Sequence, residues 1–414
     1  MRILWFSLTP SCYKSAKGLG YNGGGWISSL ETELIKRPDV ELGIAFLNGR
    51  RYVKEMQIGV CYYVMPIPQK TYQEKINYFI NYNVQTEIES YLPIFKKVVD
   101  DFKPDVIQVF GSESYLGFVK QVTDVPCVLH IQGIINPYWE AFFPPGFSKA
   151  TFISRNKSPK KMWRAYKELK TWENTCKRER EVLKQVKHYI GRTKWDEIIT
   201  RTFNPQADYH YCSEILRESF YHATNRKQPE RMTIVSTMSG VMYKGLDLVL
   251  KTADVLKRYW HVDFVWIVFG SKSLVPFFER QTGIKGNDVN VEFRGVGSEK
   301  DVCNALCHAT VFAQTSYIDN SPNAVCEAQM VGCPVVATNV GGVSSLIEDG
   351  KNGFLVPAND SYQMAWHIIT LYKNKELNRQ VGQHAMSVAQ KRHEKKQIVT
   401  DLLEIYNEIK KSIC

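Results

Sequence analysis

One strand–loop–helix–strand segment in the C-terminal half constrains the fold more than any other part of the chain. Two apolar runs, Thr310–Ala313 and Val335–Ala337, are typical of short buried strands. Between them, Ser321 is a good helix N-cap. Pro322 is tolerated as the first helical residue, because the N–H that proline lacks would have no partner at that position. Gly332 is expected to end that helix. The segment therefore predicts one unit of a parallel α/β sheet.

Two carboxylates flank the start of this helix. Asp319 lies in the loop before it, and Glu327 lies about a turn and a half inside it. A helix N-terminus offers unpaired N–H groups and about half a positive charge, so it can hold a diphosphate. Carboxylates on either side could then bind sugar hydroxyls. Taken singly, Asp319 would be explained as a turn residue and Glu327 as part of a solvated helix face.

Short apolar runs separated by amphipathic stretches form two series along the chain, divided by a polar segment at 204–229. Such alternation predicts parallel sheets covered by helices. A chain of 414 residues is also too long for one ordinary core. We therefore predict two Rossmann-like α/β domains, 1–211 and 212–394, with a hinge within 204–229 and a final amphipathic helix in 395–414. The expected strands are Ile3–Ser7, Leu42–Phe46, Val60–Val64, Val106–Phe110, Cys127–Ile131 and Tyr189–Gly191, then Thr233–Ser236, Phe264–Phe269, Val291–Phe293, Thr310–Ala313 and Val335–Ala337.

The sequence after the predicted helix extends the pattern. It continues as PVVATNVGG from Pro334 to Gly342 and as IEDGKNGFLVP from Ile347 to Pro357. This stretch resembles the signature of the family 4 retaining glycosyltransferases, although that family usually has Glu where this chain has Asp319. The resemblance implies the GT-B fold, in which two Rossmann-like domains face a central cleft. It places the nucleotide sugar on the C-terminal domain and the acceptor on the N-terminal one, with the last helix packed back onto the latter.

The resemblance also assigns roles within this segment. Glu327 matches the residue that holds the ribose hydroxyls, and Asp319 matches the position that holds hydroxyls of the transferred sugar. The backbone N–H groups of Asn323 and Ala324 would contact the diphosphate. The implied donor site further includes Gly270, Asn320 and Ser321.

The segment MSGVMYKGLDLVL, from Met238 to Leu250, resembles the family element that contacts the donor diphosphate. Lys244 matches the lysine of that element, whose charge would stabilise a departing nucleoside diphosphate. Ser239, which belongs to the implied donor site, stands where the family has an arginine, so one expected cation is missing. Without that context, Lys244 would be taken for a solvated loop lysine.

Two further candidates lie in the first half of the chain. A turn containing Gly23, Gly24 and Gly25 follows the first strand, and glycines there allow the backbone to approach a phosphate. By itself the turn indicates only flexibility, but the resemblance makes it a second wall of the diphosphate site. His130 ends a strand and matches a family histidine that faces the donor sugar, where we expect it to form a hydrogen bond. Together with the lysine and the aspartate above, it completes the expected catalytic set.

We therefore predict a hexosyltransferase-type enzyme of glycan, polysaccharide or capsule synthesis. It would move a sugar from a nucleotide sugar, expected to be a UDP-sugar, to a glycan or lipid-linked acceptor with retention of configuration. The nucleotide sugar is a substrate, so no cofactor is expected, and the absence of Asp-x-Asp favours metal-independent catalysis. Ser239 and Asp319 leave open a catalytically weakened nucleotide-sugar-binding protein. A nicotinamide-dependent oxidoreductase, which the glycine turn alone would suggest, lacks the dinucleotide fingerprint.

The net charge of +11 is concentrated in one stretch. Between Lys149 and Lys187 there are 13 Lys/Arg and 4 Asp/Glu residues, with Trp163, Tyr166 and Trp172 at helical spacing. This pattern predicts one or two basic amphipathic helices. Two interpretations stay open: a helix with solvated lysines, or a patch for anionic lipid headgroups or a lipid-diphosphate acceptor. No nucleic-acid partner is expected, because no recognition motif accompanies the charge.

The ten cysteines are scattered, several of them within apolar runs, which favours reduced thiols in a cytosolic protein. Cys303 and Cys307 are one helical turn apart and His308 follows, but no fourth zinc ligand is evident, so packing is the preferred explanation. No apolar run approaches the ~20 residues needed to cross a bilayer. We expect a cytoplasmic protein, with peripheral contact at the inner face of the cell membrane if the basic stretch binds lipid.

Overall fold

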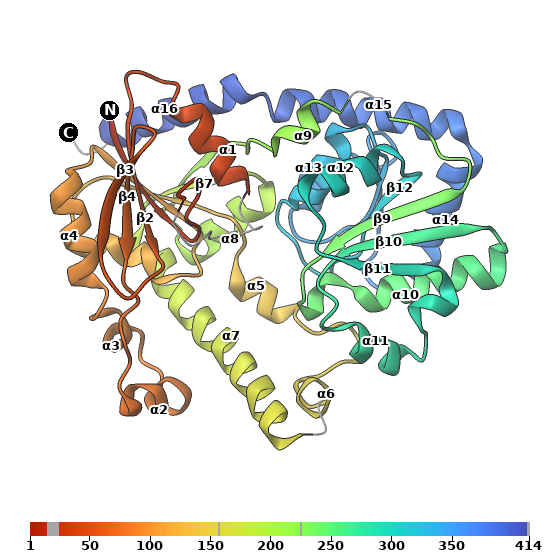
Figure 1. Cartoon of the computed structure of the whole chain (residues 1–414), viewed down its shortest axis with the longest axis horizontal. Helices are drawn as coiled ribbons and strands as arrows, with labels where there is room; N and C mark the ends of the chain where they lie inside the picture. The colour runs from red at the N-terminus through yellow and green to blue at the C-terminus, as the bar shows by residue number, and fades with distance from the viewer. Residues whose placement is uncertain (15–24, 156–157, 224–225, 412–414) are drawn as a thin grey trace. The chain divides into compact units, whose positions relative to one another are not determined.

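The computed structural model describes residues 1–14, 25–155, 158–223 and 226–411. The chain forms two compact units, each with one sheet flanked by helices (Figure 1). Unit 1 comprises Met1–Trp139, Ser158–Ile215 and Glu394–Cys414, and unit 2 comprises Glu140–Lys157 and Leu216–His393.

The sheet of unit 1 has eight strands in the order β3-β4-β2-β1-β5-β6-β7-β8. All neighbouring pairs are parallel except β3 and β4. The central strands are apolar and almost wholly buried, as strands covered on both faces must be. The strands are β1 (Arg2–Ser7), β2 (Glu41–Leu47), β3 (Val53–Gln57), β4 (Val60–Met65), β5 (Val106–Phe110), β6 (Cys127–His130), β7 (His188–Gly191) and β8 (Asp208–Tyr211).

The helices of unit 1 follow the amphipathic spacing of their sequences. In α4, for example, Phe95, Val98, Val99 and Phe102 are buried at intervals of three and four, and together they form one face that packs in the core of unit 1. The helical elements are α1 (Gly25–Leu34), α2 (Tyr72–Ile80), α3 (Val84–Ile88), α4 (Leu92–Phe102), η1 (Tyr115–Val122), α5 (Ile135–Glu140), α7 (Pro159–Gln185), α8 (Lys194–Phe203) and α16 (Lys395–Lys411).

Unit 2 contains a six-stranded, wholly parallel sheet in the order β11-β10-β9-β12-β13-β14. In such sheets ligands bind beyond the carboxyl ends of the strands. Its strands are β9 (Met232–Met238), β10 (Phe264–Gly270), β11 (Val291–Gly295), β12 (Val311–Gln314), β13 (Val335–Thr338) and β14 (Phe354–Val356). Its helical elements are α6 (Lys149–Ser154), α9 (Glu218–Tyr221), η2 (Met242–Lys244), α10 (Leu246–Val255), η3 (Leu256–Trp260), α11 (Val275–Thr282), η4 (Gly286–Val289), α12 (Glu299–Cys307), α13 (Asn323–Met330), η5 (Val343–Ser345), α14 (Ser361–Lys373) and α15 (Lys375–Arg392).

All of the predicted strands are present, with ends shifted by at most two residues. Three strands were not predicted: β3, β8 and β14. β3 (VKEMQ) and β8 (DYHY) lie at the two edges of the first sheet, where polar and exposed residues hide the apolar pattern. β14 is a three-residue edge strand of the second sheet, too short to give a periodic signal.

The units differ from the predicted domains 1–211 and 212–394 in two ways. First, the chain passes from unit 1 to unit 2 between Ile215 and Leu216, which is inside the predicted hinge but after the predicted boundary at 211. Second, residues 140–157 belong to unit 2, although the prediction placed them in the N-terminal domain. Helix α16 belongs to unit 1, where it packs on α1 and β5. Its Tyr406 is buried there, and the indole N–H of Trp5 donates to the Tyr406 hydroxyl over 3.1 Å.

The predicted basic stretch forms two helices, α6 in unit 2 and α7 in unit 1. On α7, Ala165 and Leu169 face the core, whereas Trp163 and Tyr166 are 52% and 40% exposed. These two rings stack on each other with centroids 5.3 Å apart. Within the described part of the chain, no helix combines the length and the apolar character needed to span a membrane.

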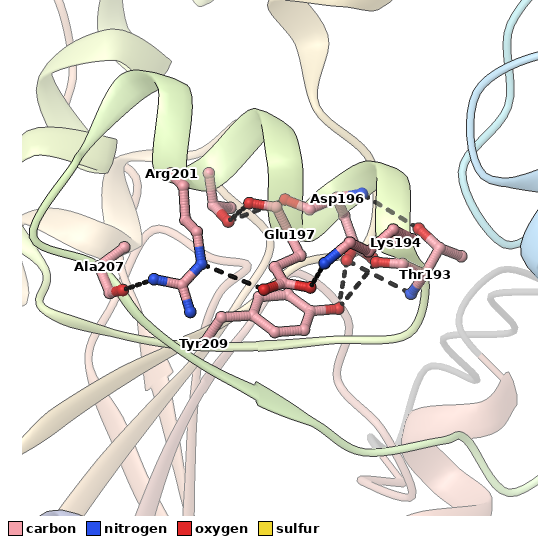
Figure 2. A network of polar contacts seen from close by, with 8 residues as sticks. Thr193, Lys194, Asp196, Glu197, Arg201, Ala207 and Tyr209 are labelled. Atoms are coloured by element: carbon pink, nitrogen blue, oxygen red, sulfur yellow. Dashed lines mark hydrogen bonds and ion pairs between the residues drawn. The ribbon is translucent and has the colours of Figure 1, made fainter.

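The carboxyl end of β7 is joined to α8 by a capping network, shown in Figure 2. Thr193 and Asp196 form a capping box, in which each side chain accepts from the other residue's backbone N–H. The Tyr209 hydroxyl, from β8, donates to Asp196. Arg201 Nε donates to Glu197 Oε1 over 3.2 Å. This network is explained by helix capping, so we assign it a structural role.

Candidate donor-binding site

The predicted lysine and the predicted aspartate form an ion pair in unit 2. Lys244 Nζ lies 2.6 Å from Asp319 Oδ2, although 75 residues separate them in sequence. Gln314 Nε2 and Ser316 Oγ also donate to Oδ2, over 2.7 and 3.2 Å. Asp319 is therefore not a solvated turn residue: its side chain is 8% exposed and three donors fix its orientation. Among the described residues, none donates a hydrogen bond to Asp319 Oδ1.

Glycine at two positions allows the backbone to pass close to the loop that carries Asp319. Gly245 has φ +72°, and a Cβ there would lie 1.9 Å from the carbonyl oxygen of Thr315. Gly341 has φ +53°, and its Cβ would lie 1.9 Å from the carbonyl oxygen of Asp319. Neither contact is possible for another residue, so glycine is required for both turns. The signature positions therefore have steric causes that the structure makes explicit.

Helix α13 begins one residue later than predicted. Pro322, not Ser321, is the N-cap residue, and no side chain caps the helix. Val325 N–H and Cys326 N–H both donate to the Pro322 carbonyl, so Asn323 and Ala324 form the first turn, where N–H groups lack intrahelical acceptors. The reason for the shift is that Pro322 adopts ψ 113°, an extended conformation that starts a helix only at the next residue. Asn320 and Ser321 are both buried in the loop before it.

Glu327 is held by an arginine that sequence reasoning missed. Arg217 Nε and Nη2 each donate to one Glu327 oxygen over 2.7 Å, a bidentate pair. The Glu327 side chain is 5% exposed, so it does not lie on a solvated helix face. Burial raises the pKa of Glu327 above its ordinary value, and the Arg217 guanidinium opposes that rise. Arg217 therefore keeps a buried carboxylate oriented and favours its charged form, while further lone pairs can accept from a ligand.

The remaining predicted residues of unit 2 lie at the carboxyl ends of β9 and β10. Gly270 ends β10. Ser239 is exposed directly after β9, and no contact of its side chain explains why it replaces the family arginine. Its neighbour Gly240 lies beside the Ser271–Ser273 loop, because a Cβ on Gly240 would come within 2.8 Å of both serine hydroxyls. That loop also carries Lys272, an exposed cation at the same edge of the sheet.

His130 lies in unit 1, at the carboxyl end of β6, and is 1% exposed. Tyr406 donates to Gln108 Oε1 over 2.6 Å, and Gln108 Nε2 lies 3.2 Å from His130 Nδ1. Gln108 therefore donates to Nδ1, which places the ring proton on Nε2. Burial, and then the charge of Arg192, hold the pKa of His130 well below its ordinary value, so the ring is neutral. Among the described residues, none forms a hydrogen bond with Nε2, which is therefore a buried N–H donor.

The predicted glycine turn is described only in part. Gly23 and Gly24 lie outside the described residues, and Gly25 is the first residue of α1. The next residue, Trp26, packs edge-on against His130 with ring centroids 5.0 Å apart. Helix α1 therefore contributes to the surroundings of the histidine. Nothing in the described residues tests the proposed contact of the turn with a phosphate.

Cys303 and Cys307 lie on α12 and are both buried. The Cys303 thiol donates to the Ser219 carbonyl at 3.5 Å. Within the described ranges, no group of three or more His, Cys, Asp or Glu residues is arranged to hold a metal ion.

Comparisons with known proteins show what this chain is similar to. Residues 218–388 match the family model for Glycosyl transferases group 1. Residues 218–388, which lie within unit 2, therefore resemble a glycosyl transferase group 1 domain. A D-inositol 3-phosphate glycosyltransferase from Paenarthrobacter aurescens is 30% identical over 36% of this chain and 37% of its own length. The N-acetyl-alpha-D-glucosaminyl L-malate synthase of Bacillus anthracis is 26% identical over 28% and 30%. The chain thus spans well under half the length of these curated relatives.

Solved structures establish the fold. Sucrose-phosphate synthase from Thermosynechococcus elongatus matches with a TM-score of 0.69 at 13% identity, over 99% of this chain and 98% of its own. Anabaena HepE in complex with UDP-glucose matches with a TM-score of 0.65 at 14% identity, over 99% and 100%. The chain has the GT-B fold, as predicted from its sequence. The family 4 assignment and the capsule-type specificity stay predictions.

Proposed function

We propose that this protein is a glycosyltransferase that moves a sugar from a nucleotide-sugar donor to a glycan or lipid-linked acceptor with retention of configuration. The observation that carries the proposal is the Lys244–Asp319 ion pair at the amino end of α13, with Glu327 buried inside the same helix. A cation, a helix N-terminus and two oriented carboxylates are the groups that a diphosphate flanked by two sugars requires. The stretch 218–388, which resembles the group 1 domain, contains all of them.

In this proposal each side chain has a distinct task. Glu327 accepts from the ribose hydroxyls, and Asp319 accepts through Oδ1 from hydroxyls of the transferred sugar. Lys244 moves its charge from Asp319 toward the leaving diphosphate, whose negative charge grows as the glycosidic bond breaks. His130 donates from Nε2 to the transferred sugar. The leaving phosphate oxygen takes the acceptor proton on the same face, which retains configuration.

Uridine is the proposed base, because HepE is solved in complexes with UDP-glucose and UDP, and TarM in one with UDP. A thermal-shift panel of UDP, ADP and GDP, each with its glucose conjugate, tests this choice, since preferential binding raises apparent stability. Transfer or slow hydrolysis of the bound sugar would establish the enzyme. Donor binding without turnover would instead identify a weakened donor-binding protein, the outcome that Ser239 suggests.

Replacing Glu327 with alanine is expected to weaken donor binding by roughly ten- to a hundredfold, the equivalent of losing charge-assisted hydrogen bonds of ~1.5–3 kcal/mol. The fold should survive, because Arg217 is 28% exposed and can turn to water. Isothermal titration calorimetry with the preferred UDP-sugar measures the loss. Glu348→Ala is the matched control, since Glu348 is 61% exposed in the same unit. Unchanged affinity would remove Glu327 from the site.

Turnover is expected to persist in excess chelator. The proposal relies on Lys244 and the amino end of α13 to offset the diphosphate charge, so it needs no bridging cation. Rates measured with and without EDTA should agree. Loss of turnover in EDTA that Mn²⁺ or Mg²⁺ restores would contradict metal-independent catalysis.

A lipid-linked acceptor would require contact with a membrane, and we propose that the amino-terminal part of α7 provides it. Trp163 and Tyr166 are exposed there among the basic residues Lys160, Lys161 and Arg164. Aromatic and basic side chains together suit the interface of an anionic bilayer.

We expect the protein to sediment with anionic vesicles at low salt and less so at ~0.15 M salt, where charges are screened beyond about 8 Å. Reversing Lys160, Lys161, Arg164 and Lys167 to Glu should abolish sedimentation, because each basic residue near the surface contributes ~1 kcal/mol. Reversal of the exposed lysines 285, 375, 391 and 396 is the control for net charge alone. Failure of the unmodified protein to sediment at low salt would make α7 an ordinary solvated helix.

A further inference from the structure

A cavity of about 600 Å³ lies in unit 2 between α9 and α12, two helices that pack on each other (Figure 1). Ser219 and His222 line it on the side of α9, and Cys303 and Cys307 line it on the side of α12. Exposed residues form its rim, so it opens to solvent. Its volume is within the ~300–1,000 Å³ range of sites that hold small molecules.

The two cysteines give this cavity a wall of thiols. Cys303 and Cys307 are four positions apart on α12, so their side chains lie on the same face of the helix. The Cys303 thiol is held by α9, because it donates to the Ser219 carbonyl at 3.5 Å. Cys307 is the last residue of α12. Its sulfur is the thiol next to the exposed end of the helix.

The surroundings of Cys307 favour its thiolate. The neighbouring Cys303 thiol holds the pKa of Cys307 below its ordinary value of 9.0, against partial burial, and the charges of His308 and Arg226 act in the same direction as Cys303. The thiolate is the nucleophilic form of cysteine. The other thiols differ, because burial raises the pKa of Cys12, Cys127, Cys212 and Cys333.

The cavity also carries positive charge. Lys227 and Lys300 line it and are both exposed. Among the described residues, neither lysine forms an ion pair, and no Asp or Glu lines the cavity. A cavity with two uncompensated ammonium groups attracts anions. Thiols and cations together therefore suit a small sulfur compound that carries carboxylates.

We propose that Cys307 is a site of reversible S-thiolation by a small disulfide that bears carboxylate groups. The Cys307 thiolate, whose proton has passed to solvent, attacks one sulfur of that disulfide. A mixed disulfide forms on Cys307 as the S–S bond of the reagent breaks, and the other half leaves as a thiolate with the electron pair. Cys307 is oxidised and the leaving half is reduced. Lys227 and Lys300 pair with the carboxylates, and a free thiol reverses the exchange.

The adduct acts on the donor site through α9. Arg217, the partner of Glu327, is the residue directly before this helix. Two hydrogen bonds hold α9 on α12: the one from Cys303, and one from the Ser219 N–H to Glu299 Oε1 over 2.7 Å. A group attached between the two helices separates them and draws Arg217 from Glu327, which weakens donor binding. Only this consequence rests on the proposed function.

The site is tested by incubating the full chain with glutathione disulfide at neutral pH and mapping the adducts at each cysteine by peptide mass spectrometry. We expect Cys307 to react at least roughly tenfold faster than Cys12, the more exposed thiol, and dithiothreitol to remove the adduct. Cys326 should stay unmodified, because it is wholly buried and reacts only in unfolded chains. A Cys307 that is unmodified, or that reacts no faster than Cys12, overturns the proposal.

The role of the lysines is tested with a second reagent, cystamine, which is a cationic disulfide. Lys227→Gln/Lys300→Gln should slow the reaction of Cys307 with glutathione disulfide by about two- to tenfold but not its reaction with cystamine. Lys285→Gln/Lys375→Gln is the matched control, since both of these lysines are exposed in unit 2 away from the cavity. Equal effects on the two reagents would overturn the preference for an anionic disulfide.

The link to the donor site is tested by calorimetry with UDP-glucose. The modified chain should bind roughly fivefold or more weakly than the reduced chain. Cys307→Ser treated in the same way should bind as it does untreated, which excludes effects of other cysteines. Equal affinity of the modified and reduced chains would overturn the link. If the reduced chain binds no UDP-glucose, the proposed function fails and the link with it, whereas the adduct map still decides whether Cys307 is the site.

Discussion

Replacing Arg217 with methionine is expected to lower the stability of unit 2 by about 3–5 kcal/mol, because it leaves the buried Glu327 carboxylate without its partner. For a unit of this size the loss corresponds to a decrease of roughly 6–20 °C in melting temperature. Differential scanning calorimetry at pH 7 measures it. An unchanged melting temperature would show that the pair contributes no net stability.

The double variant Arg217→Met/Glu327→Gln separates charge from packing. It removes both ions, so it should recover most of the stability that the single variant loses. Donor binding should not recover, because the carboxylate that we propose accepts from the ribose is gone. A double variant as unstable as Arg217→Met would place the cost in lost packing of the arginine.

The loss of the Arg217–Glu327 pair also predicts how the stability of Arg217→Met depends on pH. Burial raises the pKa of Glu327, so the folded protein holds this proton more tightly than the unfolded chain does. Stability therefore falls as pH rises above the ordinary value of 4.5, and the fall ends once pH passes the folded pKa. Removing Arg217 takes away the opposing charge, so the variant should lose more stability over this window than the parent.

Replacing Lys244 with alanine is expected to reduce kcat by about 10²–10³, the effect of removing one donor from a developing negative charge. The dissociation constant of the donor should change by less, because the charge on the leaving group is greater in the transition state than in the bound substrate. Asp319 keeps Gln314 and Ser316 as donors, so the loop should remain in place. Steady-state kinetics and calorimetry on one preparation separate the two effects.

Lys351→Ala is the control for that experiment, since Lys351 pairs with an exposed glutamate in the same unit. It should leave kcat unchanged. If Lys244→Ala weakens donor binding as much as it lowers kcat, the lysine contributes equally to ground and transition states.

The sequence was sufficient for the fold because central parallel strands are continuous apolar runs, which the chain shows twice. It was insufficient at the sheet edges, where β3 and β8 expose polar residues on both faces. It misplaced 140–157 because a short amphipathic helix carries no information about which core it joins.

The candidate site was predictable wherever residues are close together along the chain. Asp319 and Glu327 are eight positions apart, and one helix relates them. Arg217 is 110 positions from Glu327, in a segment that looked like a plain hinge, and no local pattern marks it. Gln108, which sets the tautomer of His130, was hidden inside an apolar strand and takes its orientation from Tyr406, 298 positions away.

Helix α16 completes unit 1 although the ribosome makes it after all of unit 2. The Trp5 indole can reach the Tyr406 hydroxyl only after the chain has been synthesised as far as Tyr406, 401 positions further on. All of unit 2 emerges during that interval and can fold as a whole, since domains fold as units during synthesis. Unit 1 must meanwhile leave the surface under α16 uncovered. Unit 1 therefore begins to be made before unit 2 but finishes folding after it.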